Sequence, residues 1–347
     1  MSGPDLAGLG GWPAVLGPLT AGQDLLASDA RAAMLEILSG EATPAQIAGF
    51  IVALRMKGET VDELVGLLDA MGEVGERVAL PDLDDVLDVV GTGGDRRHTV
   101  NISTMAALTA AGAGVRVCKH GNRAASSRCG TADVFEALGV RLELGPAEVA
   151  ACVADAGIGF CFAPRFHPAM RHAGPTRKEL GVPTVFNFLG PLANPAGVRR
   201  QLVGVADAGM AERVARVLVA RGSIRALVAY GDDGLDELTT TTTSTIVEIV
   251  EGEVHRRVVD PGELGIHRAA PADLEGGDAG ENAEIVRRYL AGEPGPVRDI
   301  ALLNAAAGLV AAGRADDLAA GFELGRDAVD SGRAAAALDA LVAVSNH

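Results

Sequence analysis

The chain has 347 residues, 48% of them hydrophobic, which is enough to bury a large core and to build two domains. Its formal net charge of −16 would repel a nucleic-acid backbone, and with 3% aromatic residues few side chains could stack on bases. No uncharged apolar run reaches the roughly 18 residues that cross a bilayer, and no basic segment opens the chain, so we expect a cytoplasmic protein without a membrane partner.

The first part of the chain is predicted to be helical. Residues 1–20 carry several Gly and Pro residues, and we expect a flexible tail there. Residues 43–46 and 60–63 each place Gln or Glu three residues after Thr, which is the pattern of a helix capping box. Apolar residues then recur at helical spacing, which predicts an all-helical domain over residues 21–84 whose apolar faces form a core or a dimer surface.

From residue 85 onwards, strand-like and helix-like segments alternate. Seven apolar runs are predicted as strands, at residues 86–90, 115–118, 141–144, 158–162, 201–205, 226–230 and 245–250. The alternation predicts an α/β fold in which a small all-helical N-terminal domain precedes a larger domain with a mostly parallel central sheet flanked by helices. In such a sheet, ligands bind at the carboxyl ends of the strands.

A glycine-rich turn, residues 91–95, follows the first predicted strand, and the small-residue run 105–114 is expected to form a helix opened by hydrogen-bonding side chains of residues 99–104. Such turns bring backbone N–H groups against phosphate, and a helix N-terminus attracts the same anion. The spacing matches neither the Rossmann nor the Walker motif. A phosphate-binding loop and an ordinary strand-to-helix turn both fit this segment taken alone.

A second polar loop, residues 119–133, follows the next strand. Its cations and hydroxyls are Lys119, Arg123, Arg128, Ser126, Ser127 and Thr131. We expect Thr131 to cap the following helix. So many donors suit an anionic ligand, and a solvated basic loop is the alternative. An acidic protein that binds a polyanion must gather its cations locally, and Arg171 and Arg177 lie in the same stretch of sequence.

An acidic turn, residues 231–237, follows the strand predicted at 226–230. Carboxylates in this position suit Mg²⁺, which takes one or two of them beside substrate phosphates. A plain Asp/Gly turn is the alternative. The threonine-rich tract at 239–243 is predicted to be a loop without chemistry.

Several of these motifs occur together in an order that resembles a known family. They are Gly91-Thr-Gly-Gly-Asp95, Lys119-His-Gly-Asn-Arg123, His167-Pro-Ala-Met-Arg171, Pro175-Thr-Arg177-Lys-Glu-Leu-Gly181, Phe186-Asn-Phe-Leu-Gly-Pro-Leu-Ala-Asn-Pro195 and Gly234-Leu-Asp236-Glu237. Over roughly residues 20 to 345 the chain resembles the anthranilate phosphoribosyltransferases of tryptophan biosynthesis, in the nucleoside phosphorylase-like phosphoribosyltransferase family. The resemblance implies a pentosyltransferase that moves 5-phosphoribose from phosphoribosyl pyrophosphate to the amine of anthranilate, with Mg²⁺.

The resemblance also implies a homodimer, and a domain division in which roughly residues 174–197 complete the helical domain, while 85–173 and 198–347 form the α/β domain. The residues that match the family's substrate-binding motifs are Gly91, Gly94, Asp95, Thr99, Asn101, Ile102, Ser103, Thr104, Lys119, His120, Gly121, Asn122, Arg123, Ala124, Ala125, Ser126, Ser127, Thr131 and Arg177. Those that match its metal site are Ser103, Asp236 and Glu237.

By this resemblance, Arg177 binds the anthranilate carboxylate, for which a guanidinium fork is suited. His120 is either a general base or a residue that only hydrogen-bonds the substrate. Thr131 stands where the family commonly has Ser, and it keeps the hydroxyl. Pro183 stands where Arg is frequent, which leaves one cation fewer near the acceptor, so the sequence does not fix which acceptors the protein takes. A pyrimidine nucleoside phosphorylase and an inactive, ligand-binding paralogue are the rival interpretations.

Overall fold

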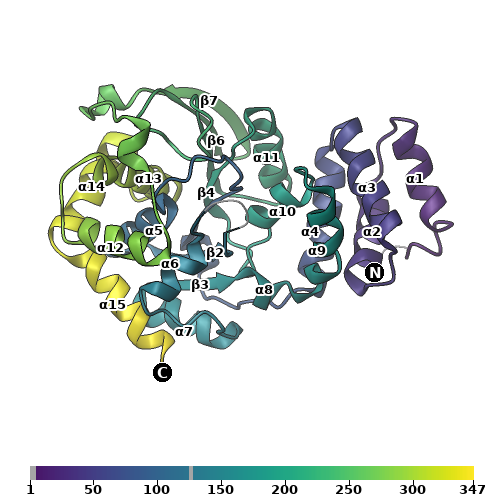
Figure 1. The fold of residues 1–347 in the computed structure, drawn as a ribbon, viewed down its shortest axis with the longest axis horizontal. Helices are drawn as coiled ribbons and strands as arrows, with labels where there is room; N and C mark the ends of the chain where they lie inside the picture. Colours follow the sequence, from purple (N-terminus) through teal and green to yellow (C-terminus); the bar gives the residue numbers. More distant parts are fainter. Residues whose placement is uncertain (1–4, 125–127) are drawn as a thin grey trace.

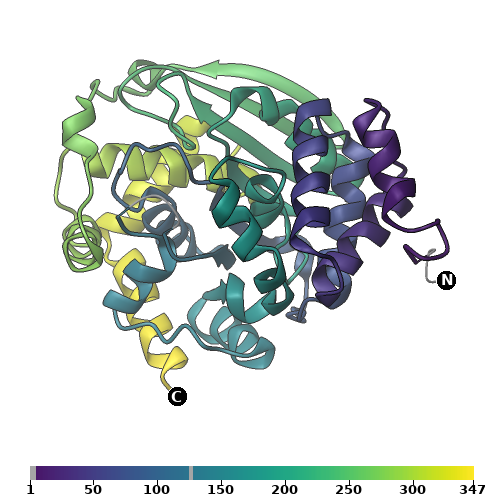
Figure 2. The same ribbon diagram turned by 45° about the vertical axis from the view of Figure 1, so that its right-hand side comes forward.

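The computed structural model describes residues 5–124 and 128–347, which form a small helical domain beside a larger α/β domain (Figure 1). The helices of the N-terminal segment are α1 (Trp12–Thr20), α2 (Ala27–Ser39), α3 (Pro44–Lys57) and α4 (Val61–Val74). They stand side by side at one end of the molecule, and the C-terminal helices lie at the other end (Figure 2). Two later helices, α9 (Gly174–Leu180) and α10 (Phe186–Leu192), contact α3 and α4.

The capping boxes predicted in this domain are present. Thr43 accepts a hydrogen bond from the backbone N–H of Gln46, and Thr60 accepts one from that of Glu63. In both boxes the second side chain bonds back to the N–H of the threonine. Each box therefore satisfies two N–H groups that a helix start would otherwise leave unpaired.

The expectation of a flexible tail over residues 1–20 is wrong for residues 12–20, which form α1. Trp12, Val15 and Leu19 of this helix are buried, and the Trp12 ring packs edge-on against Phe50 with its centroid 5.9 Å away. A nine-residue helix is marginal by itself in water, so packing against the domain stabilises α1 more than its own sequence does.

The α/β domain contains one sheet of seven strands in the order β3-β2-β1-β4-β5-β6-β7. The strands are β1 (Val86–Gly91), β2 (Arg116–Gly121), β3 (Ile158–Phe162), β4 (Arg200–Gly204), β5 (Arg225–Gly231), β6 (Ser244–Val250) and β7 (Glu253–Val259). The first five are parallel, and β6 and β7 continue the sheet antiparallel. The prediction of a mostly parallel sheet is confirmed.

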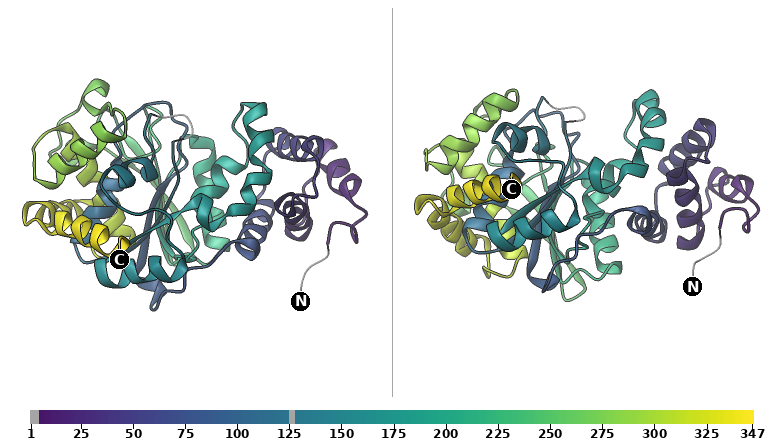
Figure 3. Two further views of the ribbon diagram at one scale, coloured as in Figure 1. Left: turned by 60° about the horizontal axis from the view of Figure 1, so that its bottom comes forward. Right: turned by 90° about the horizontal axis from the view of Figure 1, so that it is seen from below.

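Helices cover both faces of this sheet (Figure 3). Those of the α/β domain are α5 (Ile102–Gly112), α6 (Thr131–Ala137), α7 (Pro146–Ala156), α8 (Ala163–Phe166), α11 (Ala208–Ala220), α12 (Ala279–Leu290), α13 (Pro296–Ala311), α14 (Leu318–Asp330) and α15 (Arg333–Ser345). Side chains alternate along the strands, so Leu202 packs in the core beneath α5 and α13, whereas Val203 packs in the core shared with α11 and the helical domain. None of the described helices is long and apolar enough to span a bilayer.

Two strand predictions differ from the structure. Residues 141–144 form no strand, and the Arg141 N–H donates to Ser345 Oγ of α15 instead of to a sheet neighbour. Strand β7 was not predicted, because its sequence is not an apolar run. It lies at the sheet edge, where Val254, Arg256 and Val258 are exposed.

Candidate active site

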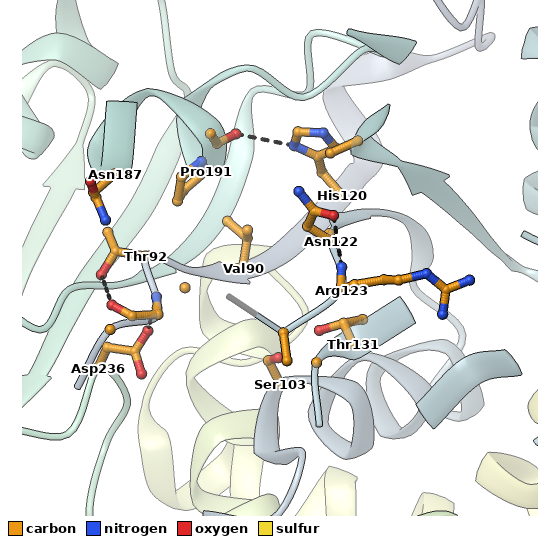
Figure 4. A pocket seen from close by; sticks show the side chains of 18 of the residues that line it. Val90, Thr92, Ser103, His120, Asn122, Arg123, Thr131, Asn187, Pro191 and Asp236 are labelled. Atoms are coloured by element: carbon orange, nitrogen blue, oxygen red, sulfur yellow. Dashed lines mark hydrogen bonds between the residues drawn. The ribbon is translucent and has the colours of Figure 1, made fainter. Parts of the chain in front are cut away.

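A cavity of about 920 Å³ opens where the two domains meet, at the carboxyl ends of β1 and β2 (Figure 4). Its walls come from the β1–α5 loop, the β2–α6 loop, the acidic turn after β5 and the segment between β3 and α10. The expected site residues that line it are Gly91, Gly94, Asp95, Thr99, Asn101, Ile102, Ser103, Lys119, His120, Gly121, Asn122, Arg123, Ala124, Thr131, Arg177, Asp236 and Glu237.

The remaining expected residues are not placed in this wall. Thr104 is fully buried in the first turn of α5, and its hydroxyl makes no hydrogen bond within the part of the chain that the structure describes. Ala125, Ser126 and Ser127 lie outside the described residues.

Arg123 and Thr131 line the cavity, but not in the expected way. The Arg123 guanidinium points away from it (Figure 4), paired with Asp133 at 2.9 Å and Glu136 at 2.8 Å. Thr131 does not cap α6, because the N-cap is Gly130, whose N–H donates to Asp133 at 2.9 Å. Asp133 and Glu136 of α6 therefore pair with the guanidinium that was expected to bind the anionic substrate.

The glycine-rich loop after β1 packs against the acidic turn after β5. The N–H of Gly93 donates to Asp236 Oδ2 at 2.6 Å. A Cβ on Gly91 would lie 2.6 Å from that oxygen, and a Cβ on Gly204 only 1.6 Å from the Asp236 carbonyl oxygen. Glycine is therefore required at these positions because the acidic turn approaches the backbone. By contrast, the backbone N–H groups of residues 94–96 make no hydrogen bond with any described residue, which leaves them free for an anion.

The start of α5 faces a carboxylate of the protein. The N–H of Ser103 donates to Glu237 Oε1 at 3.0 Å, where the helix dipole also favours negative charge. The N–H of Thr104 bonds the carbonyl of Asn101. The expectation that these amides face the same anion as the glycine loop is therefore not met, because Glu237 already occupies the helix N-terminus.

The ionised forms of Asp236 and Glu237 are disfavoured, because both carboxyl groups are buried and nearby cations do not balance their charge. Burial, and then the charge of Asp95, raise the pKa of Asp236 to about 7. Burial and the neighbouring carboxylates also raise the pKa of Glu237 well above its usual range, and Lys119 only partly opposes this. No group of three or more His, Cys, Asp or Glu side chains suited to a metal occurs among the described residues. Two adjacent carboxylates, one of them bonded to the N–H of Ser103, nevertheless fit Mg²⁺, which relies on water and substrate oxygens for its other ligands.

The threonine tract shapes this turn. Asp233 Oδ2 accepts hydrogen bonds from Thr239 Oγ1 at 2.8 Å and from Thr241 Oγ1 at 2.5 Å. The other oxygen of Asp233 accepts the N–H of Leu235, the residue before Asp236. The tract, predicted to be without chemistry, thus fixes the backbone that presents the two carboxylates.

We therefore expect Thr241→Val to raise the Mg²⁺ concentration for half-maximal rate roughly fivefold, since one hydrogen bond is worth about 1 kcal/mol. Thr242→Val is the matched control, because the Thr242 hydroxyl makes no hydrogen bond within the described chain. Magnesium titrations of the two variants check this, and equal curves would show that the tract does not position the turn.

Lys119 lies on the floor of the cavity. Its ammonium donates to the carbonyl of Val89 and to Ser103 Oγ, the latter at 3.3 Å. Burial lowers its pKa to about 8, and Asp88 and Glu237 oppose that shift. Asp88 is itself buried, accepting from the His120 N–H at 3.1 Å and from Asn194 Nδ2 at 2.8 Å. The negative charge of Asp88, which does not line the cavity, thus favours the charged form of Lys119.

His120 presents one free ring nitrogen. Its Nδ1 lies 3.1 Å from the carbonyl of Gly190 (Figure 4), which fixes the tautomer with hydrogen on Nδ1. Nε2 is buried and has no partner in the described chain. Burial and the adjacent His167 lower the pKa of His120 to about 3. So weak a base is poorly suited to take a proton near pH 7.

Arg177 lies on the opposite wall, in α9. Its guanidinium stacks over the Phe186 ring, 5.0 Å from the centroid, and makes no ion pair or hydrogen bond with a described residue. Burial lowers its pKa, yet a guanidinium stays charged. An unpaired, half-buried cation with a planar fork suits a ligand carboxylate.

The sequence interpretation missed Arg96 and His98, which line the cavity beside the glycine loop. It also passed over Asn187. The signal available for Arg96 and His98 was the basic run of residues 96–98 directly after the glycine loop.

An anion loop, a pair of carboxylates and an unpaired guanidinium around one cleft fit an enzyme that binds a phosphorylated substrate and a carboxylic acid together. Comparisons with known proteins agree. The family model described as "Glycosyl transferase family, a/b domain" matches residues 83–335, and that described as "Glycosyl transferase family, helical bundle domain" matches residues 13–75.

Relatives with this architecture are similar over nearly the whole chain. Anthranilate phosphoribosyltransferase of Rhodococcus opacus is 58% identical, covering 94% of this chain and 91% of the relative. The crystal structure of the Thermus thermophilus enzyme has a TM-score of 0.91 at 42% identity, covering 96% and 99% of the two chains. The Saccharomyces cerevisiae enzyme in complex with PRPP and Mg has a TM-score of 0.88 at 27% identity, covering 96% and 98%. The chain belongs to this glycosyl transferase family and, within it, to the anthranilate phosphoribosyltransferases.

Proposed function

We propose that the protein transfers 5-phosphoribose from phosphoribosyl pyrophosphate to the amine of anthranilate, giving N-(5-phosphoribosyl)anthranilate and pyrophosphate in tryptophan biosynthesis. The observation that carries the proposal is the pairing, across one cavity, of an anion-binding loop with the unpaired guanidinium of Arg177. A polyphosphorylated donor and a carboxylate-bearing acceptor need these two features at opposite walls. A nucleoside phosphorylase needs no acceptor carboxylate site.

The donor side stabilises the leaving group. As the bond between the anomeric carbon and pyrophosphate breaks, negative charge builds on pyrophosphate and positive charge on the sugar. The free N–H groups of residues 94–96 and the ammonium of Lys119 supply fixed positive potential, often the largest catalytic term. The floor of the cavity is buried, and the low local dielectric there strengthens these contacts.

The acceptor side orients the amine. Arg177 would hold the carboxylate of anthranilate and so direct the lone pair of the amine toward the sugar. An aromatic amine is already a neutral nucleophile near pH 7, so attack needs no strong base. The weak basicity of His120 is consistent with that.

Ser103, Asp236 and Glu237 are the residues that would hold Mg²⁺. When bound, the ion supplies positive charge to the pyrophosphate oxygens. The yeast relative was solved in complex with PRPP and Mg, which supports Mg²⁺ as the ion used.

The test is an assay of the purified protein. Anthranilate fluorescence should fall only when phosphoribosyl pyrophosphate and Mg²⁺ are both present, with equimolar release of pyrophosphate. Cleavage of uridine or thymidine by inorganic phosphate should not occur. Phosphorolysis without loss of anthranilate would contradict the proposal and favour the phosphorylase.

Replacing Lys119 by alanine should weaken donor binding. A lost charge-assisted contact is worth about 2 kcal/mol, or roughly a 30-fold rise in KM for phosphoribosyl pyrophosphate. Lys119→Met keeps most of the buried volume, so agreement between the two variants separates charge from packing. Steady-state kinetics with melting temperatures check this, and unchanged constants would remove Lys119 from the site.

The homodimer and the cytoplasmic location stay predictions. Leu26 and Met56, on the helical domain, are 68% and 83% exposed, which is consistent with an apolar surface available for a second copy. Light scattering of the protein as it elutes from a size-exclusion column measures its molar mass and so tests whether it is a dimer.

A further inference from the structure

One cation at the cavity has no partner among the described residues and is not among those that bind the acceptor, the metal ion or the leaving group. Arg96, in the β1–α5 loop, is exposed and lines the cavity. Its guanidinium makes no ion pair or hydrogen bond with any of residues 5–124 or 128–347. Arg123 differs, since it is held by Asp133 and Glu136, and Arg171 donates to the carbonyl of Pro168 at 3.4 Å. Within the described chain Arg177 is unpaired like Arg96, but it lies on the acceptor side.

The wall that carries Arg96 is otherwise short of positive charge. Asp95, Asp236 and Glu237 all line it, and Lys119 is the cation on its floor. Arg177 lies across the cavity, on the acceptor side. A donor with several negative charges that approaches this wall meets carboxylates first, and an unpaired guanidinium at its mouth would offset their repulsion.

The backbone of this loop is held in an unusual conformation. Gly93 and Gly94 have φ 63° and 82°, and from Gly94 onwards left-handed residues alternate with others, since Arg96 has φ 59° and His98 has φ 53°. Left-handed conformations cost free energy in non-glycine residues, and they cluster at ligand sites. Such alternation is also how a backbone nest aims successive N–H groups at an anion, and the N–H groups of residues 94–96 are unpaired here.

We propose that Arg96 is a donor-binding residue, which contacts the pyrophosphate of phosphoribosyl pyrophosphate at the mouth of the cavity together with the free amides of residues 94–96. The inference rests on the proposed function and adds a residue to its site. Because Arg96 is exposed, its contribution depends on salt, unlike that of the buried Lys119.

The neighbouring arginine provides a matched control. Arg97 is also exposed and unpaired through its side chain within the described chain, but it does not line the cavity. Its guanidinium lies instead beside Gly234, where a Cβ would come within 3.5 Å. Arg96→Gln and Arg97→Gln thus remove the same charge from adjacent positions, and only the first removes it from the cavity.

The experiment compares both variants with the wild type by calorimetric titration of phosphoribosyl pyrophosphate with Mg²⁺, without anthranilate, and by steady-state kinetics. At about 50 mM salt, Arg96→Gln should raise both the Kd and the KM for the donor roughly fivefold. The difference from the wild type should be smaller at about 300 mM salt. The KM for anthranilate should stay unchanged, Arg96→Lys should recover most of the loss, and Arg97→Gln should behave as the wild type.

Equal loss of donor affinity in Arg96→Gln and Arg97→Gln would overturn the proposal, because the effect would then come from the net charge of the loop and not from a contact of Arg96. Wild-type affinity in Arg96→Gln would overturn it as well. If the wild type binds the donor but consumes no anthranilate, the proposed function fails, while the calorimetric comparison still decides the role of Arg96.

Discussion

Arg177→Ala is expected to raise the KM for anthranilate roughly 150-fold while leaving the KM for phosphoribosyl pyrophosphate nearly unchanged. The guanidinium stacks on Phe186 and has no carboxylate partner among the described residues, so a bound acid would make its only ion pair. Loss of a bidentate, partly buried contact of this kind costs about 3 kcal/mol. Arg177→Lys should recover little, since a point charge does not reproduce the fork.

Lys178→Ala is the control for this result. Lys178 is the next residue of α9, is exposed and does not line the cavity. Both Michaelis constants and the melting temperature should be measured for each variant. An arginine that merely packs on Phe186 would lower the melting temperature and shift both constants alike, and that outcome would refute the assignment.

The double variant Asp236→Asn with Glu237→Gln should raise the Mg²⁺ concentration for half-maximal rate roughly 100-fold or more, since even residues that only support metal ligands change metal affinity by about 10- to 100-fold. Asp232→Asn serves as the control, because Asp232 is an exposed carboxylate of the same turn that bonds Thr243. Calorimetric titration with Mg²⁺ reports binding independently of turnover. Superimposable titrations of the double variant and the wild type would show that the pair is only a turn.

The same pair predicts a pH effect on the metal-free protein. Burial raises the pKa of Asp236 from 3.8 to about 7, so ionisation is less favourable in the folded than in the unfolded chain. The free energy of unfolding should therefore fall as the pH rises from about 4 to about 7, and the double variant should lose this dependence. Denaturant titrations in a chelator at several pH values measure it, and parallel pH profiles for the two proteins would contradict it.

Features that depend on neighbours in the chain were predictable from the sequence. The capping boxes at Thr43 and Thr60 close between residues three apart, so their letters suffice to identify them. The run at 158–162 is apolar throughout and forms β3 with the predicted bounds. The motifs and their order also identified the family, because these motifs form several of the loops that line the cavity.

Features that depend on distant partners were decided only by the tertiary structure. Residues 141–144 alternate like a strand, but Ser345, 204 residues later, takes the Arg141 N–H. The helix over residues 12–20 is stabilised by the packing of Trp12 against Phe50. The Arg123 guanidinium points away from the cavity because Asp133 and Glu136 of α6 pair with it. A hydrogen bond within one turn is set by spacing alone, whereas long-range contacts require the whole chain to fold, and their geometry determines which cations remain free for substrate.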